Sequence, residues 1–120
     1  MSEHVYWILE LDLQTGKEEE FRALMEEMVT ATRANEPGAL NYEWSTSDDG
    51  RVCHIFERYA DSAATMQHLA NFGEKFAARF MEILSPTQFT VYGSPNQQVK
   101  DALATFGVAI MQQVGGFSRG

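Results

Sequence analysis

The centre of the chain carries two alternating segments joined by a turn signal. In Leu40–Thr46, apolar or aromatic residues at every second position alternate with polar ones, and Val52–Tyr59 has a similar strand-forming composition. Asp48-Asp49-Gly50 lies between them and is typical of a tight turn. The pattern predicts an antiparallel hairpin. Helical patterns flank it on both sides, so few folds remain open to the chain.

The helical patterns have recognisable starts and stops. Thr15 and Glu18 form a capping box, which predicts a helix of about 18 residues that ends at Pro37-Gly38. Asp61 predicts the cap of a second helix. We expect Asn71-Phe72-Gly73 to interrupt that helix before a further helical stretch.

Strands are predicted at the two ends of this pattern, at His4–Leu13 and, after Pro86, at Thr87–Tyr92. Ser94-Pro95-Asn96-Gln97 then predicts another helix, with Ser94 as its cap, and Val108–Val114 predicts a short fifth strand. The chain thus divides into a main unit, residues 1–93, and a C-terminal extension, residues 94–120. We expect the extension to pack on the same domain or on a partner subunit.

The order strand, helix, strand, strand, helix, strand predicts an α+β fold, the ferredoxin-like split βαβ, with helices on one face of an antiparallel sheet. The second face of the sheet also needs cover, because we assign to it the apolar residues Tyr6, Ile8, Tyr42, Trp44 and Phe56. A second copy of the chain is the simplest cover, so we expect a homodimer.

Composition excludes several classes of partner. The net charge of −8 repels phosphate backbones and anionic lipids, which argues against nucleic-acid and membrane partners. No apolar run reaches membrane-spanning length, and Glu3 stands where a signal peptide carries cations, so we expect a cytoplasmic protein. Cys53 is the only cysteine and is expected to be a core residue. The histidines His4, His54 and His68 lack metal-ligand spacing, and no metal site is expected.

Several short motifs resemble one family in both order and spacing. The chain is similar to the antibiotic biosynthesis monooxygenases over about residues 4 to 92, and its C-terminal motifs resemble an extended bacterial branch of quinol monooxygenase-like proteins. The resemblance rests on Gly16-Lys17-Glu18-Glu19-Glu20-Phe21, Glu36-Pro37-Gly38-Ala39-Leu40-Asn41-Tyr42, Phe56-Glu57-Arg58-Tyr59-Ala60-Asp61, His68-Leu69, Tyr92-Gly93-Ser94-Pro95 and Gly116-Phe117-Ser118-Arg119.

The resemblance implies a dimeric barrel and, for some members, oxygenation of phenols, quinols or anthrones without metal or flavin. Other members degrade haem, using an Asn, a Trp and a His at set positions. Those positions fall near Leu9, on His68, and near Arg79 or Phe80, so none of the three residues is kept. We therefore expect no haem degradation and no cofactor. Function does not follow from fold, however, and a non-catalytic dimeric module that binds a small hydrophobic ligand, or acts as a scaffold, is the alternative.

A cofactor-free oxygenase needs a base and an apolar pocket. His68 is the candidate base, with Asn71 one helical turn on as a candidate oxyanion donor; a structural histidine and a cap or loop amide are the competing interpretations. Glu57 is either the polarising partner of a histidine or half of a salt bridge. The candidate substrate-binding residues are Tyr6, Tyr42, Trp44, Phe56, Glu57 and Phe72, and the aromatic residues on the strands can equally serve as sheet packing.

Overall fold

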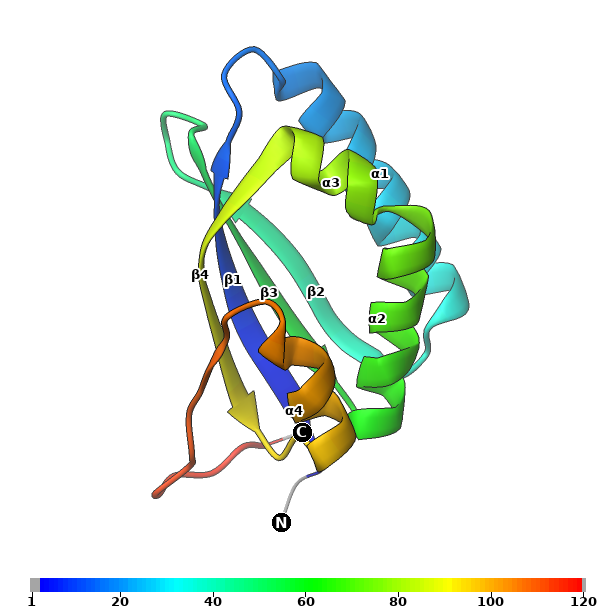
Figure 1. Cartoon of the computed structure of the whole chain (residues 1–120), viewed down its shortest axis with the longest axis vertical. Helices are drawn as coiled ribbons and strands as arrows, with labels where there is room; N and C mark the ends of the chain where they lie inside the picture. Colours follow the sequence, from blue (N-terminus) through cyan, green and yellow to red (C-terminus); the bar gives the residue numbers. More distant parts are fainter. Residues whose placement is uncertain (1–2, 120) are drawn as a thin grey trace.

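The computed structural model of the protein describes residues 3–119 and confirms the α+β, ferredoxin-like order predicted from the sequence. A helical layer covers one side of a twisted sheet (Figure 1). The elements are β1 (Val5–Leu13), α1 (Glu18–Asn35), β2 (Ala39–Thr46), β3 (Val52–Tyr59), α2 (Ser62–Lys75), α3 (Ala77–Ile83), β4 (Leu84–Gly93), α4 (Gln97–Ala104) and β5 (Ala109–Ile110).

Within the described residues the sheet has the order β2-β3-β1-β4-β5. The pairs β2–β3, β3–β1 and β1–β4 are antiparallel, whereas β5 lies parallel to β4 through Thr90 and Val91. The fifth strand is shorter than predicted and consists only of Ala109 and Ile110. A register shift in the β1–β4 pair follows Glu10, next to the level of Pro86. Because proline has no N–H for a ladder, a bulge is a place in a sheet where it is tolerated.

The helix boundaries follow the sequence signals in part. Asp61 caps α2 as predicted, and its carboxylate accepts a hydrogen bond from the backbone N–H of Ala64 at 2.8 Å. The cap predicted at Ser94 is wrong, since Asn96 fills that role by accepting from Val99 N–H at 2.9 Å. Both side chains are good caps. Because α4 begins at Gln97, the N-cap position falls on Asn96 and not on Ser94.

Two other boundary predictions are also wrong. Thr15 does not cap α1, whose N-cap is Lys17 with no side-chain hydrogen bond. Three acidic residues in the first turn supply the favourable charge at this end instead. The second helix also runs through Asn71-Phe72-Gly73 and breaks only at Phe76. A glycine inside a helix costs about 1 kcal/mol relative to alanine, which packing can offset.

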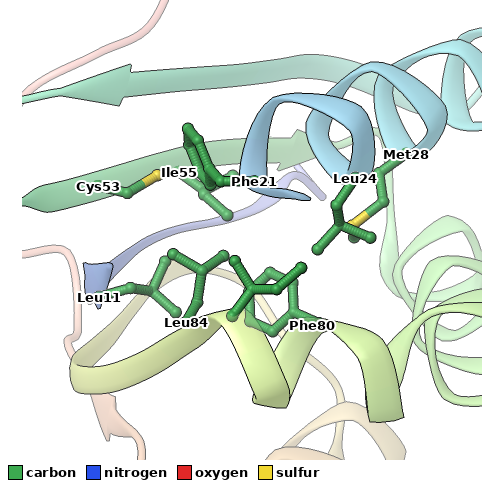
Figure 2. Packing of buried hydrophobic residues seen from close by; sticks show 9 residues of the cluster. Leu11, Phe21, Leu24, Met28, Cys53, Ile55, Phe80 and Leu84 are labelled. Atoms are coloured by element: carbon green, nitrogen blue, oxygen red, sulfur yellow. The ribbon is translucent and has the colours of Figure 1, made fainter. Parts of the chain in front are cut away.

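The core between α1, α3 and the sheet is built from alternate strand residues and one stripe of each helix. Figure 2 shows Leu11, Cys53 and Ile55 from the strands facing Phe21, Leu24, Met28 and Phe80 from the helices. Each fully buried side chain of this kind contributes roughly 1.5–3 kcal/mol of hydrophobic stabilisation. Cys53 is a buried core residue, as expected, and burial raises the pKa of its thiol to about 12.

The assignment of Tyr42 and Trp44 to the second face of the sheet is wrong. Tyr42 lies opposite Glu57 in the ladder, and its ring contacts that of His68 on α2. Trp44 packs against Phe21 and Phe80 on the helical side. Alternation separates the two faces of a strand but does not tell which face is covered by helices. In β2 the aromatic residues are on the helix-facing side.

The outer face of the sheet, on the other side from the helices, still carries an apolar group. Its members Tyr6, Ile8, Phe56 and Tyr92 are all partly exposed, with Tyr6 stacked on Tyr92 at 5.5 Å between ring centroids. An antiparallel sheet that is covered by helices on one face commonly has a polar, solvated second face. The outer face is therefore more apolar than a solvated sheet face needs to be.

Helix α4 packs on the helix-facing side of the same sheet. Val99 and Leu103 are fully buried against Val5, Trp7 and Val91. Beyond this helix the chain runs as an extended segment along the β4 edge, coloured orange to red in Figure 1. We call residues 105–119 the C-terminal segment. It exposes several large apolar side chains, namely Phe106, Ile110, Met111, Val114 and Phe117.

Candidate active site

A cavity of about 530 Å³ lies between the sheet and helices α2, α3 and α4. Its wall is mainly apolar, and a volume of this size falls in the range of small-molecule sites. The sheet, α2, α3 and the end of α4 all contribute to the wall. Its aromatic members are Trp7, Tyr42, Phe72, Phe80, Phe89 and Phe106.

Two ionisable side chains that contact each other, Glu57 and His68, also line this cavity. Glu57 comes from β3 and His68 from α2, and their exposed fractions are only 4% and 6%. His68 Nε2 lies 3.2 Å from Glu57 Oε1. Buried charges persist in proteins when they are paired and hydrogen-bonded, and this pair meets that condition. Glu57 thus contacts a histidine in an ion pair, and its role as a polarising partner stays a prediction.

A second carboxylate engages the other nitrogen of the same ring. Glu36, at the C-terminal end of α1 and 5% exposed, accepts a hydrogen bond from His68 Nδ1 at 2.9 Å through Oε1. Its Oε2 accepts a hydrogen bond from Asn71 Nδ2 at 3.2 Å. Both nitrogens of His68 are therefore occupied by carboxylates, one on each side of the ring.

Tyr59 completes the group that we call the histidine cluster: Glu36, His68, Glu57 and Tyr59. The Tyr59 hydroxyl donates to Glu57 Oε1 at 2.6 Å, so this single oxygen accepts from both Tyr59 and His68. Among the described residues, no hydrogen bond is made to Glu57 Oε2. Glu57 thus has one oxygen fixed within the protein and a second oxygen available on a side chain that lines the cavity.

The two carboxylates determine the charge of His68. Burial alone would lower the pKa of the imidazole, but the hydrogen bonds with Glu36 and Glu57 outweigh burial and raise it to about 9. Burial likewise opposes ionisation of Glu36, yet the hydrogen bond and charge of His68 hold the pKa of that carboxyl below its usual value. At neutral pH the ring is an imidazolium between two carboxylates.

The neighbouring phenols stay protonated. Burial, followed by the charge of Glu57, raises the pKa of both Tyr42 and Tyr59 well above the ordinary tyrosine value. The ring of Tyr59 lies 5.1 Å from that of His68, and the ring of Tyr42 lies 5.3 Å from it. The rings of Tyr42 and Tyr59 therefore pack against the imidazolium, and neither tyrosine adds a charge.

Local sequence explains why His68 reaches this position. Asp61 fixes the start of α2, and His68 follows two turns later on the buried side. Gly38 permits the close approach of that helix, since a Cβ at residue 38 would lie 2.5 Å from the Cβ of Ala64. The turn that carries Gly38 also carries Glu36, so one tight contact sets the spacing between carboxylate and imidazole.

A small crevice of about 10 Å³ lies on the outer side of the cluster, lined by Glu36, Asn71 and Lys75 among others. It has room for about one water molecule. Asn71 thus faces Glu36 and this crevice, and it is not part of the cavity wall.

The structure separates the predicted site residues into three groups. His68, Glu57, Tyr42 and Phe72 line the cavity. Trp44 lies on the same side of the sheet but packs into the core against Phe21 and Phe80. The third group lies outside the cavity: Asn71 contacts Glu36, while Tyr6 and Phe56 pack edge to face on the outer face of the sheet.

Sequence reasoning missed Glu36 and Tyr59 as members of the site. Glu36 stands immediately before Pro37-Gly38, where it reads as part of a turn. A signal was available, because a carboxylate at the C-terminal end of a helix opposes the helix dipole and needs a cationic partner. Tyr59 carried no comparable signal, since a buried tyrosine at a strand end is ordinary packing.

Residues 3–119 contain no group of three or more His, Cys, Asp or Glu side chains arranged to hold a metal ion. In the same part of the chain, no helix has both the length and the apolar character that crossing a membrane requires.

Both a family match and similar solved structures relate this chain to known proteins. The family described as antibiotic biosynthesis monooxygenase matches residues 5–78. Rv0793 from Mycobacterium tuberculosis is 30% identical, with a TM-score of 0.62 over 73% of this chain and 91% of that one. No curated protein matches the sequence.

Two further solved structures share the fold. MupZ from Pseudomonas fluorescens is 23% identical, with a TM-score of 0.83 over 98% of this chain and 96% of that one. SnoaB, a cofactor-independent oxygenase from Streptomyces nogalater, is 15% identical, with a TM-score of 0.65 over 80% of this chain and 97% of that one. With the family match over residues 5–78 and the 30% identical relative, the chain belongs to the antibiotic biosynthesis monooxygenase family.

Proposed function

We propose that the protein is a cofactor-independent monooxygenase of small electron-rich aromatic compounds, of the phenol, quinol or anthrone type. One observation carries the proposal: an apolar cavity of about 530 Å³ with the ionised pair Glu57–His68 in its wall. Family membership and the likeness to SnoaB, an oxygenase without a cofactor, support the reaction class.

The proposed reaction requires few functional groups from the protein. A base removes a proton from the substrate, and the resulting anion passes an electron to dioxygen. The substrate radical and superoxide combine to a peroxide, which loses water as a carbonyl forms. For an anthrone the CH₂ group and O₂ become C=O and H₂O, so the substrate is the only reductant. The cavity contributes binding, orientation and a dry environment for the anion.

His68 has a different role in this proposal from the one expected from sequence. An imidazolium whose two nitrogens both donate to carboxylates has no lone pair with which to accept a proton. It supplies positive charge next to the cavity and stabilises the substrate anion. The pKa of about 9 keeps this charge in place at neutral pH. Asn71 acts on His68 only indirectly, through its hydrogen bond to Glu36.

We also propose that the protein is a homodimer assembled through the outer face of the sheet. The apolar residues of that face support this assembly, and so does the C-terminal segment, in which Val114 is fully exposed and Phe117 is 78% exposed. Exposed apolar groups of this extent usually mark an interaction surface. In this proposal residues 94–120 contribute α4 to their own domain and the C-terminal segment to the partner.

The test of the reaction class is oxygen uptake with anthrone and with reduced quinols, measured above the uncatalysed oxidation. We expect the wild-type protein to accelerate uptake, and His68→Gln to lose at least about 10-fold of that rate, because one buried charge is removed. Glu26→Gln, on the exposed side of α1, is the control and should keep the wild-type rate.

The alternative is a module that binds hydrophobic ligands without turning them over. Saturable binding of anthrone under anaerobic conditions, together with oxygen uptake no faster than the uncatalysed reaction, would establish that alternative and reject the monooxygenase. A protein that neither binds nor oxidises any aromatic probe would exclude both ligand-based functions and leave the scaffold.

A further inference from the structure

We propose that Glu57 is the catalytic base of the site, acting through Oε2, and that His68 is the fixed cation beside it. The inference rests on the proposed monooxygenase function and assigns the proton-accepting atom within it. Sequence patterns favour the histidine as base, since histidine titrates nearest to neutral pH. The geometry of the histidine cluster favours the carboxylate.

The atoms that the cluster leaves available distinguish the two candidate bases. His68 directs Nδ1 to Glu36 at 2.9 Å and Nε2 to Glu57 at 3.2 Å, so neither nitrogen is open to a substrate. Glu57 uses only Oε1 for its two protein partners. Its Oε2 accepts no hydrogen bond from the described residues, and the side chain lines the cavity. Oε2 is the acceptor that this cluster offers to a ligand.

The position of Glu57 also suits a base. Glu57 stands in the middle of the sheet, between Trp7 on β1 and Tyr42 on β2. The hydroxyl of Tyr59 at 2.6 Å and the ring of His68 hold its carboxylate in one orientation. A base that is held rigidly beside a binding cavity needs little reorganisation when the proton moves. The wall around it is mainly apolar, which strengthens its interaction with the acidic group of a bound ligand.

The charges of Glu57 and His68 also stay balanced during turnover. When Glu57 takes a proton from an anthrone CH₂ group, the carboxylate becomes neutral and the substrate becomes an anion, so the charge of the site is unchanged. The His68 imidazolium then pairs with the substrate anion instead of with Glu57. After dioxygen adds, Glu57 returns its proton to the peroxide oxygen. The restored carboxylate then removes the second C–H proton as hydroxide leaves, and the two combine to water.

A carboxylate is a weak base for an acidic C–H or phenol, and the imidazolium compensates for this. The adjacent positive charge stabilises the anion as it forms, so the proton transfer becomes less unfavourable than in water. The groups that face the Glu57–His68 pair are Glu36 from the end of α1, Tyr42 from β2 and Tyr59 from β3, with Lys75 acting on Glu36 from α2. Both tyrosines stay neutral, so Glu36 is the second charge that touches the ring.

The wild-type pH profile with anthrone as the probe decides between the two bases. If Glu57 is the base and His68 the cation, the enzymatic rate falls as pH rises through about 9, because the imidazolium loses its proton there. If His68 is the base, the rate rises through the same range, and that result would overturn the proposal. The uncatalysed oxidation at each pH is subtracted. This readout depends on no variant, so it holds even if substitutions impair folding.

Variants supply the second readout. We expect Glu57→Gln, which keeps the shape of the side chain, to lower kcat about 100-fold or more. Glu57→Asp should retain part of the activity, and Glu26→Gln all of it. Oxygen uptake by the wild type together with full activity in Glu57→Gln would reject Glu57 as base and leave the monooxygenase intact. Absence of uptake in the wild type would reject both the base and the reaction class.

Discussion

The charge on His68 makes the stability of the protein depend on pH. Its pKa is raised from 6.5 to about 9 in the folded state, so the fold is stabilised fully below pH 6.5. That stabilisation declines as pH rises from 6.5 to about 9, where the folded protein releases the proton. The size of the effect is on the order of 3 kcal/mol.

We therefore expect the free energy of unfolding, from urea titrations, to decrease between pH 6.5 and about 9 in the wild type. In His68→Gln this decrease should disappear. His54→Gln is the control, because His54 is exposed on the outer face of the sheet, and it should follow the wild type. An unchanged decrease in His68→Gln would assign the pH dependence to another group.

Part of this site could be predicted at the level of single residues. The sequence predicts a role for His68 in the site, and one interpretation of Glu57 makes it the partner of a histidine. Neither prediction could state the charge of the ring, because that charge depends on Glu36, which lies 32 residues away and arrives at the end of another helix. A base and a cation look alike in sequence, and only the number of carboxylates around the ring tells them apart.

At the scale of the elements, the approach of α2 to the β2 end of the sheet depends on Gly38. An added Cβ would lie 2.5 Å from the Cβ of Ala64, closer than two side chains can pack. Gly38→Ala must therefore push α2 outward, which loosens the contact between His68 and Glu36. We expect a loss of about 1–3 kcal/mol in the free energy of unfolding, measured by urea titration.

Gly73 provides the matched control for that measurement. It lies inside α2 with nothing within 4 Å of an added Cβ. Gly73→Ala should raise stability by about 0.5–1 kcal/mol, because alanine is the better helix former. If Gly38→Ala also proved neutral or stabilising, the close contact would not be what positions α2.

Element types were predictable where side chains act locally, and boundaries were less so. Asp61 marks the start of α2 because its carboxylate meets an N–H three residues away. Asn96 and Ser94 compete for one cap, and their sequence alone does not rank them. The helix continues through Gly73 because buried Thr65 and His68 anchor it, a contribution from distant partners that local preference does not contain.

At the scale of the whole molecule, the sequence predicted the layers but not the distribution of aromatic residues between them. Tyr42 and Trp44 belong to the helical side, whereas Tyr6, Phe56 and Tyr92 belong to the outer face. The cavity was not predictable, because an unfilled volume depends on how every neighbouring side chain packs.

The outer face and the C-terminal segment lead to a prediction about assembly. We expect sedimentation to show a dimer at micromolar concentration. Replacing Val114 and Phe117 by serine should weaken that dimer without lowering the stability of the subunit, since both side chains are exposed within it. Met81→Ser, exposed on α3, is the control and should leave the dimer unchanged. A wild-type monomer at that concentration would contradict the assembly.

The charge of the histidine cluster also affects which molecules we expect the cavity to bind. Two carboxylates and one imidazolium leave a net negative charge beside the cavity, and the chain as a whole carries a formal charge of −8. A ligand that arrives as an anion meets repulsion both outside and within the apolar cavity, where water screens it little. Neutral aromatic molecules enter without this penalty. Under the proposed function, we therefore expect the site to take up compounds that are uncharged in solution and to ionise them inside the cavity.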